Sequence, residues 1–210
     1  MQLTTLTHVN ATTDEAGGSL LSFTADRPFT HKAGQFGIWF CGGALRPFTI
    51  ASAPRDEFVQ LGTHLHNGSA IKRGLTALRP GDRIRLLGAF GKVAPPEDGR
   101  PIVFVAQGIG ITVARSLLRQ PSNRPRHLIH TGRPYFQDEL APLAETATYP
   151  PDRDAFTITL NASLRATPGA HWVITGSPTF VKSTAGILRN NEVDAARLHA
   201  DGFLGLPDRD

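Results

Sequence analysis

The stretch VFVAQGIGITVARSLL, residues 103–118, decides the fold class of the second half of the chain. An apolar run predicts a buried strand, a glycine turn follows, and the next residues continue as a helix. Glycines in such a turn let a backbone approach a ligand, and the helix start offers N–H groups to a pyrophosphate. Gly108 and Gly110 are therefore candidate nucleotide contacts. The same pattern also occurs as a plain connection, so alone it leaves both readings open.

The rest of the second half repeats this rhythm of strand, turn and helix. Alternating units with continuous apolar strands are typical of a parallel sheet that carries helices on both faces. We expect strands at PIVFVA (101–106), RHLIHT (126–131), FTITLNA (156–162) and HWVITG (171–176), and helices at 111–119, 138–147 and about 180–190.

The first half reads as short strands punctuated by Gly, Pro and Asp. Six antiparallel strands predict a closed Greek-key β-barrel, interrupted by one helix at about 69–78. The segment APPEDGR, residues 94–100, has the composition of a linker. We therefore predict two domains, a β-barrel over residues 1–98 and an α/β domain over residues 99–210. The expected strands are at 2–11, 18–26, 34–40, 45–52, 58–66 and 82–90.

Composition excludes several classes of protein. The 210 residues are 40% hydrophobic and 19% charged, which is ordinary for a globular protein, and no apolar run approaches the ~20 residues of a membrane span. The first residues lack a secretory signal, so we expect a cytoplasmic protein. The single cysteine, Cys41, cannot form an internal disulfide or hold a metal cluster alone, and no His, Asp or Glu spacing resembles a metal site. Redox chemistry would therefore use an organic cofactor or a partner's metal.

The charge favours phosphate-bearing ligands or an acidic partner. The net charge is +4, and 18 of the 22 basic residues are arginine, whose guanidinium binds phosphates and carboxylates in a bidentate manner. The basic residues are scattered, without the clusters or motifs of a nucleic-acid-binding protein.

A second candidate anion site lies in the first half, in HLHNGSAIKRG, residues 64–74. Gly68 and Ser69 stand where the first turn of a helix would begin, which suits a phosphate group. The alternative is that Ser69 only caps the helix. Two phosphate cradles on two domains suggest nucleotides that meet at the domain boundary.

Five motifs in order resemble those of the ferredoxin-NADP reductase family of flavin enzymes. They are RPFTIAS, the stretch from HLHNGSAIKRG to LLGAFG, VAQGIGIT, TGSPTFV and DGFLGL, and the resemblance covers residues 3 to 206. The resemblance implies a flavin-binding barrel, an NAD(P)-binding α/β domain, and FAD and NAD(P)H as cofactors.

The resemblance also implies roles for residues of the barrel. Arg46 would pair with the flavin diphosphate, Phe48 would stack on the isoalloxazine or pack beside it, and Thr49 would hydrogen-bond near flavin N5. The family more often has Tyr where Phe48 stands. The remaining implied flavin contacts are Pro47, His64, Leu65, His66, Gly68 and Ser69.

In the second half the resemblance is accompanied by departures. Gln107 and Val113 replace a glycine and a proline of the family, and Thr175 stands where a cysteine faces the nicotinamide. Thr49, Thr175 and Asp201 are the implied catalytic residues, with Asp201 in place of Glu. Other implied cofactor contacts are Ile111, Thr112, Arg133, Gly176 and Phe203. Ser163 and Arg165 could grip an NADP 2′-phosphate, although their register differs from the family's pair by one residue.

The leading hypothesis is an FAD-dependent reductase that takes hydride from NAD(P)H and passes electrons to a separate acceptor, such as a ferredoxin, a flavodoxin or an oxygenase component. One alternative is a reductase of ferric chelates or free flavin. Another is a flavin-binding module or subunit without hydride transfer, motivated by the departures at Gln107, Val113 and Thr175.

Overall fold

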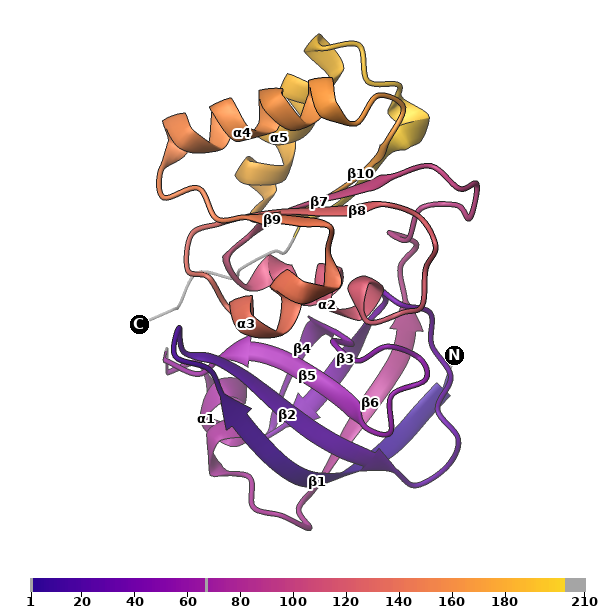
Figure 1. Cartoon of the computed structure of the whole chain (residues 1–210). Coiled ribbons are helices and arrows are strands. Elements are labelled where there is room, and N and C mark those ends of the chain that lie inside the picture. The colour runs from indigo at the N-terminus through magenta and orange to yellow at the C-terminus, as the bar shows by residue number, and fades with distance from the viewer. Residues whose placement is uncertain (1, 67, 203–210) are drawn as a thin grey trace.

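The computed structural model describes residues 2–66 and 68–202. The first part of the chain forms one six-stranded antiparallel sheet in the order β4-β3-β6-β1-β2-β5. A bridge between Ile50 and Leu61 joins its two edges into a barrel (Figure 1). The predicted antiparallel barrel is thereby confirmed. The strands are β1 (Gln2–Thr13), β2 (Gly18–Ala25), β3 (Phe36–Cys41), β4 (Ala44–Thr49), β5 (Val59–His64) and β6 (Arg83–Phe90).

Side-chain alternation explains the barrel core. In β3 the residues Gly37, Trp39 and Cys41 are buried while those between them are partly exposed, as expected for a strand with one face inward. Trp39 packs on Phe23 of β2, with ring centroids 5.7 Å apart. Helix α1 (Ala70–Ala77) follows β5 and buries Ile71 and Leu75 in the same cluster. The helix predicted at about 69–78 is therefore present.

The second part of the chain forms a five-stranded sheet in the order β11-β10-β7-β8-β9, and every strand pair is parallel. Figure 1 shows α2 and α3 between this sheet and the barrel, and α4 and α5 on its opposite face. The predicted parallel sheet with helices on both faces is thus confirmed. The strands are β7 (Ile102–Gln107), β8 (Arg126–Thr131), β9 (Thr146–Thr148), β10 (His171–Gly176) and β11 (Leu198–Gly202), and the helices are α2 (Ile111–Leu118), α3 (Gln137–Leu140), α4 (Arg153–Ala166) and α5 (Pro178–Asn190).

The expected strand FTITLNA, residues 156–162, is wrong, because these residues lie inside helix α4. Asp152 caps this helix by accepting a hydrogen bond from the Ala155 N–H at 2.8 Å. Phe156 and Leu160, one turn apart, are buried against the sheet. Burial of that helical face outweighs the strand preference of the β-branched residues between them.

The expected helix at 138–147 is also wrong in extent. Helix α3 ends at Leu140, a short 3₁₀ turn covers Ala141–Leu143, and β9 follows at Thr146–Thr148. Pro142 removes a backbone donor, which prevents the α-helix from continuing. The strand predicted between 126–131 and 171–176 therefore exists, but it is the short β9 and not residues 156–162.

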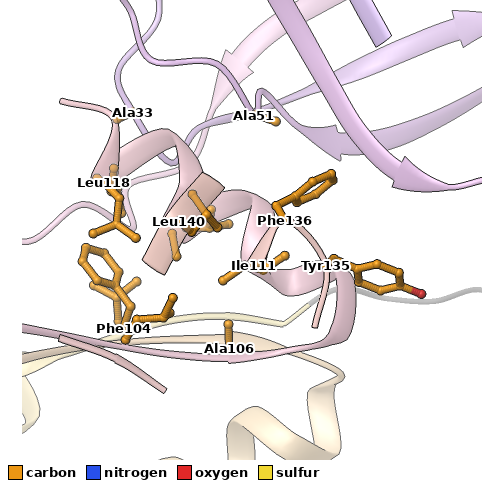
Figure 2. Packing of buried hydrophobic residues seen from close by; sticks show 14 of the residues in the cluster. Ala33, Ala51, Phe104, Ala106, Ile111, Leu118, Tyr135, Phe136 and Leu140 are labelled. Atoms are coloured by element: carbon orange, nitrogen blue, oxygen red, sulfur yellow. The ribbon is translucent and has the colours of Figure 1, made fainter. Parts of the chain in front are cut away.

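The two sheets share a packed layer built around α2. Figure 2 shows Phe104 and Ala106 of β7 beneath Ile111 and Leu118 of α2, with Ala51 of the barrel on the other side. All of these side chains are buried in one apolar cluster. The domain boundary is therefore a continuous core, and the precise division at residue 98 stays a prediction.

Polar groups of α2 bind the barrel backbone within this layer. Arg115, only 3% exposed, donates from Nη1 to the Ala51 carbonyl at 2.7 Å. Ser116 Oγ donates to the Ser52 carbonyl at 2.7 Å and accepts from the Gly34 N–H at 3.2 Å. These buried bonds fix the helix against the segment that directly follows β4.

Candidate functional site

The strand order places a crevice at the carboxyl ends of β7 and β10. From β7 the chain moves to β8 and β9 on one side, then crosses to β10 and β11 on the other. Ligands of open parallel sheets bind at such a switch point, outside the carboxyl ends of the strands. The Gly108–Gly110 turn follows β7 and Gly176 ends β10, so both predicted glycine sites flank this crevice.

The glycine turn needs glycine for two reasons. Gly108 has φ +51, and a Cβ added there would meet nothing within 4 Å, so this position borders open space. A Cβ at Gly110 would lie 2.8 Å from the Thr175 carbonyl oxygen, because β10 passes directly against the turn. The turn is therefore open on the Gly108 side and closely packed on the β10 side.

Neighbouring side chains bind all three carbonyl oxygens of the turn. His130 Nε2 lies 2.9 Å from the Gly108 carbonyl, Thr112 Oγ1 donates to Ile109 at 3.1 Å, and Thr175 Oγ1 donates to Gly110 at 2.9 Å. Burial lowers the pKa of His130 to about 4, so the ring is neutral near pH 7 and donates from Nε2 to the carbonyl. With its carbonyls held by the protein, the turn offers amide groups to a ligand, as an anion requires.

The predicted catalytic residues Thr175 and Asp201 lie side by side on β10 and β11, where the two residues are register partners. Thr175 is 1% exposed and its hydroxyl is committed to Gly110, so it shapes the glycine turn. Burial raises the pKa of Asp201. Their catalytic roles stay predictions, and the predicted contact at Phe203 lies outside the described residues.

On β4, the predicted flavin contacts differ in what they leave available. Arg46 Nη1 donates to the Leu45 carbonyl at 2.9 Å, and within residues 2–66 and 68–202 it forms no ion pair. Phe48 packs partly into the barrel core, while Pro47 is exposed. Thr49 is 2% exposed, and its hydroxyl has no hydrogen-bond partner among the described residues. A guanidinium without an ion pair among the described residues and a hydroxyl without a hydrogen-bond partner among them, both on one strand, suit a polar ligand.

The structure speaks against the alternative that Ser69 only caps α1. Ser69 is the N-cap residue, but its side chain makes no capping hydrogen bond. Arg73 Nη1 donates to the Gly68 carbonyl and thus braces the turn from the next helical turn. The Gly68–Ser69 turn therefore combines a hydroxyl, a guanidinium and the start of a helix.

Aromatic rings beside this turn connect the two domains. The His64 ring at the end of β5 is nearly parallel to those of His66 and Tyr135, with interplanar angles of 18° and 8°. Lys72 Nζ of α1 lies 3.2 Å from His64 Nδ1. Leu65, between the histidines, packs partly against the barrel core. The sequence reading missed Tyr135, which follows the exposed Arg133 in the loop after β8.

Two further contacts were missed, one at this boundary and one within the parallel-sheet domain. Arg115 bonds to the barrel from α2, and Ser177 Oγ at the start of α5 donates to Gln107 Oε1 at 2.8 Å. Ser163 and Arg165, expected to grip a 2′-phosphate after a strand, lie instead on α4, which packs on the sheet face opposite the barrel (Figure 1). The strand expected before this pair is therefore wrong, and the 2′-phosphate contact stays a prediction.

No group of three or more His, Cys, Asp or Glu residues within 2–66 and 68–202 could hold a metal ion. No helix in the same ranges is long and apolar enough to span a membrane.

Solved structures of reductases have the same fold. One is a ferredoxin NADP+ reductase from Neisseria gonorrhoeae with bound FAD and NADP, with a TM-score of 0.81 and 21% identity over 96% of this chain and 99% of that chain. A ferredoxin reductase in carbazole 1,9a-dioxygenase gives a TM-score of 0.82 and 18% identity over 97% of this chain and 70% of that chain. The ferredoxin-NADP+ reductase from Plasmodium falciparum gives 0.78 and 15%, over 95% of each chain.

The chain therefore has the two-domain fold of ferredoxin reductases, a barrel followed by a parallel sheet. No family model matches the sequence. No curated protein matches it either. The predicted resemblance is thus borne out at the level of the fold.

Proposed function

We propose that this protein is an NAD(P)H-dependent flavoprotein reductase that holds FAD on the barrel and passes electrons to a separate acceptor. One observation carries the proposal: two glycine turns that each lead into a helix, one on each domain, lie near the same boundary. The Gly108–Gly110 turn opens at the switch point of the sheet, and α2, which follows it, is bonded to the segment after β4. The likeness to a reductase with bound FAD and NADP supports the same reading.

The residues of the barrel suit FAD. Arg46, without an ion pair in the described residues, would bind the diphosphate together with Ser69 and the turn at Gly68. Thr49 carries a buried hydroxyl without a partner, which a hydrogen-bonding edge of the flavin ring would satisfy. Phe48 would supply an aromatic surface beside the ring.

The residues of the sheet suit a pyridine nucleotide. The amide groups of the Gly108–Gly110 turn would hold a diphosphate, and His130 keeps the Gly108 carbonyl turned away from it. Thr175 and Asp201 lie at the carboxyl ends of adjacent strands beside this turn. When bound, FAD supplies the chemistry of accepting a hydride from NAD(P)H and releasing electrons singly or in pairs. The chain positions the two cofactors and shields them from water.

The acceptor is proposed to be a separate protein or small oxidant. A single cysteine cannot ligate an iron–sulfur cluster, so the chain has no electron carrier of that kind within its 210 residues. The net charge of +4 favours an acidic carrier through electrostatic steering. Ferredoxins, flavodoxins and oxygenase components fit this description.

The test is an anaerobic titration of the FAD-reconstituted protein with NADPH and, separately, with NADH, followed by visible absorption. Bleaching of the flavin band by either nucleotide supports the proposal and identifies the donor. A bound flavin that stays oxidised in excess of both nucleotides contradicts it and favours a binding module. Turnover of ferric citrate faster than that of any protein carrier would favour the chelate reductase.

A further inference from the structure

A side-chain bridge joins the carboxyl ends of β7 and β10, which are paired in the sheet. Gln107 is the last residue of β7, and Ser177 follows β10 directly and caps α5. Ser177 Oγ donates to Gln107 Oε1 at 2.8 Å. The two residues thus connect the strands on either side of the switch point, where the fold places a ligand.

The stem of Gln107 also lies against Gly176 at this end of the sheet. A Cβ added at Gly176 would lie 2.8 Å from Gln107 Cβ, so the glutamine stem rests on the Gly176 backbone. The Gly108–Gly110 turn begins at the residue after Gln107, and the side of the turn at Gly108 is open. The Gln107 side chain therefore lies beside both the Gly108 side of the turn and Gly176, where a ligand at the switch point would meet it.

We propose that the Gln107–Ser177 bridge is a gate that a pyridine nucleotide must open to enter the site. The inference rests on the proposed function, because it takes the nucleotide to bind at this switch point. The hydrogen bond joins a half-buried to an exposed side chain, so it is weak enough to be exchanged for a ligand. The gate lowers nucleotide affinity without discriminating NAD(H) from NADP(H), because the bridge contains no group specific for a 2′-phosphate.

Variants can separate the bridge from the other roles of its residues. Ser177 also accepts a hydrogen bond from the Phe180 N–H, so it is replaced by Gly, which is tolerated at a helix N-cap far better than Ala. Gln107→Met keeps the length of the side chain and removes the hydrogen bond, while Gln107→Gly removes the bulk as well. Gln120→Met, beyond the far end of α2, is the matched control.

The experiment is calorimetric titration of the FAD-reconstituted protein with NADP+ and with NAD+. Gln107→Met and Ser177→Gly should each lower the Kd for both nucleotides by about fivefold, the factor that corresponds to one hydrogen bond of about 1 kcal/mol. The double variant should bind no tighter than either single variant, because both changes remove the same bond. Gln120→Met should leave both Kd values unchanged.

Other results overturn the gate in distinguishable ways. Weaker binding by Gln107→Met would make the glutamine a ligand contact, and an unchanged Kd would make the bridge irrelevant to entry. Tighter binding by Gln107→Gly but not by Gln107→Met would assign the effect to bulk rather than to the hydrogen bond. Absence of binding heat in the parent protein and in every variant would refute nucleotide binding itself, and the gate with it.

Discussion

Removal of Arg115 should destabilise the protein more than removal of the more exposed Arg119, which caps the same helix. Arg115 is buried, and it donates to the Ala51 carbonyl at 2.7 Å, to Gln60 Oε1 at 2.9 Å and to Glu139 Oε2 at 2.8 Å. The variant Arg115→Met keeps the apolar stem of the side chain but removes all three bonds. The loss therefore falls on the contact between α2 and the barrel.

The expected loss of unfolding free energy depends on which hydrogen bonds the partners of Arg115 keep in the variant. A buried carbonyl left without a donor costs about 1–3 kcal/mol. Breaking a fully buried ion pair costs roughly 3–5 kcal/mol, but Glu139 is partly exposed and keeps Arg119 Nη1 at 2.9 Å, so the cost here is lower. We expect a total of about 3 kcal/mol, or a fall in Tm of roughly 6–12 °C for a chain of this size.

Arg119→Met is the matched control for this measurement. Arg119 is the C-cap residue directly after α2 and binds the same carboxylate, together with Asp56, but its side chain is 34% exposed. Exposed pairs contribute up to about 1 kcal/mol, so this variant should lower Tm by only about 2–4 °C. Thermal unfolding followed by circular dichroism measures both shifts. A larger shift for Arg119→Met than for Arg115→Met would refute the view that the buried contact holds the domains together.

Three further predictions concern other residues of the site. Burial lowers the pKa of His130 from 6.5 to about 4, so the unfolded chain binds a proton first as the pH falls. The free energy of unfolding should therefore decline between about pH 6.5 and 4. His130→Gln should flatten that decline in denaturant titrations. Burial raises the pKa of Asp201, so ionisation at higher pH opposes folding; Asp201→Asn should raise Tm at pH 7 and leave it nearly unchanged at pH 3, and equal shifts at both would contradict this. Arg46→Ala should weaken FAD binding by about tenfold or more, measured as flavin retained on purification, whereas the exposed Arg55→Ala should retain the parent amount; full retention by Arg46→Ala would exclude the diphosphate contact.

The glycine turn and the barrel were predictable because their signals are local. The turn at Gly108–Gly110 follows a continuous apolar strand, and residues typical of turns separate the barrel strands from one another. The helix at Arg153–Ala166 was missed because its threonines and isoleucine favour a strand locally. Its cap at Asp152 and the spacing of Phe156 and Leu160 were the signals that could have identified it.

The contacts between the domains could not be predicted in the same way. Arg115 is one of 18 arginines, and nothing in its local sequence separates it from an arginine on an exposed helix face. Its partners Ala51 and Gln60 are more than fifty residues away along the chain. The same holds for Gln107 and Ser177, which become neighbours only because β7 and β10 are paired in the sheet.

Helix α2 connects the Gly108–Gly110 turn to the barrel. Its first turn continues from the Gly108–Gly110 turn, and its second half holds the carbonyls of Ala51 and Ser52, directly beyond Thr49 on β4. Eight helical residues span only about 12 Å, so the helix is a short rigid spacer between the two candidate cofactor sites. Under the proposed function, hydride transfer requires reacting atoms about 3–3.5 Å apart, which a flexible linker alone could not maintain. The buried hydrogen bonds of α2 fix the sheet at one distance from the barrel. The same bonds would therefore both stabilise the fold and keep the two cofactors in position for the reaction.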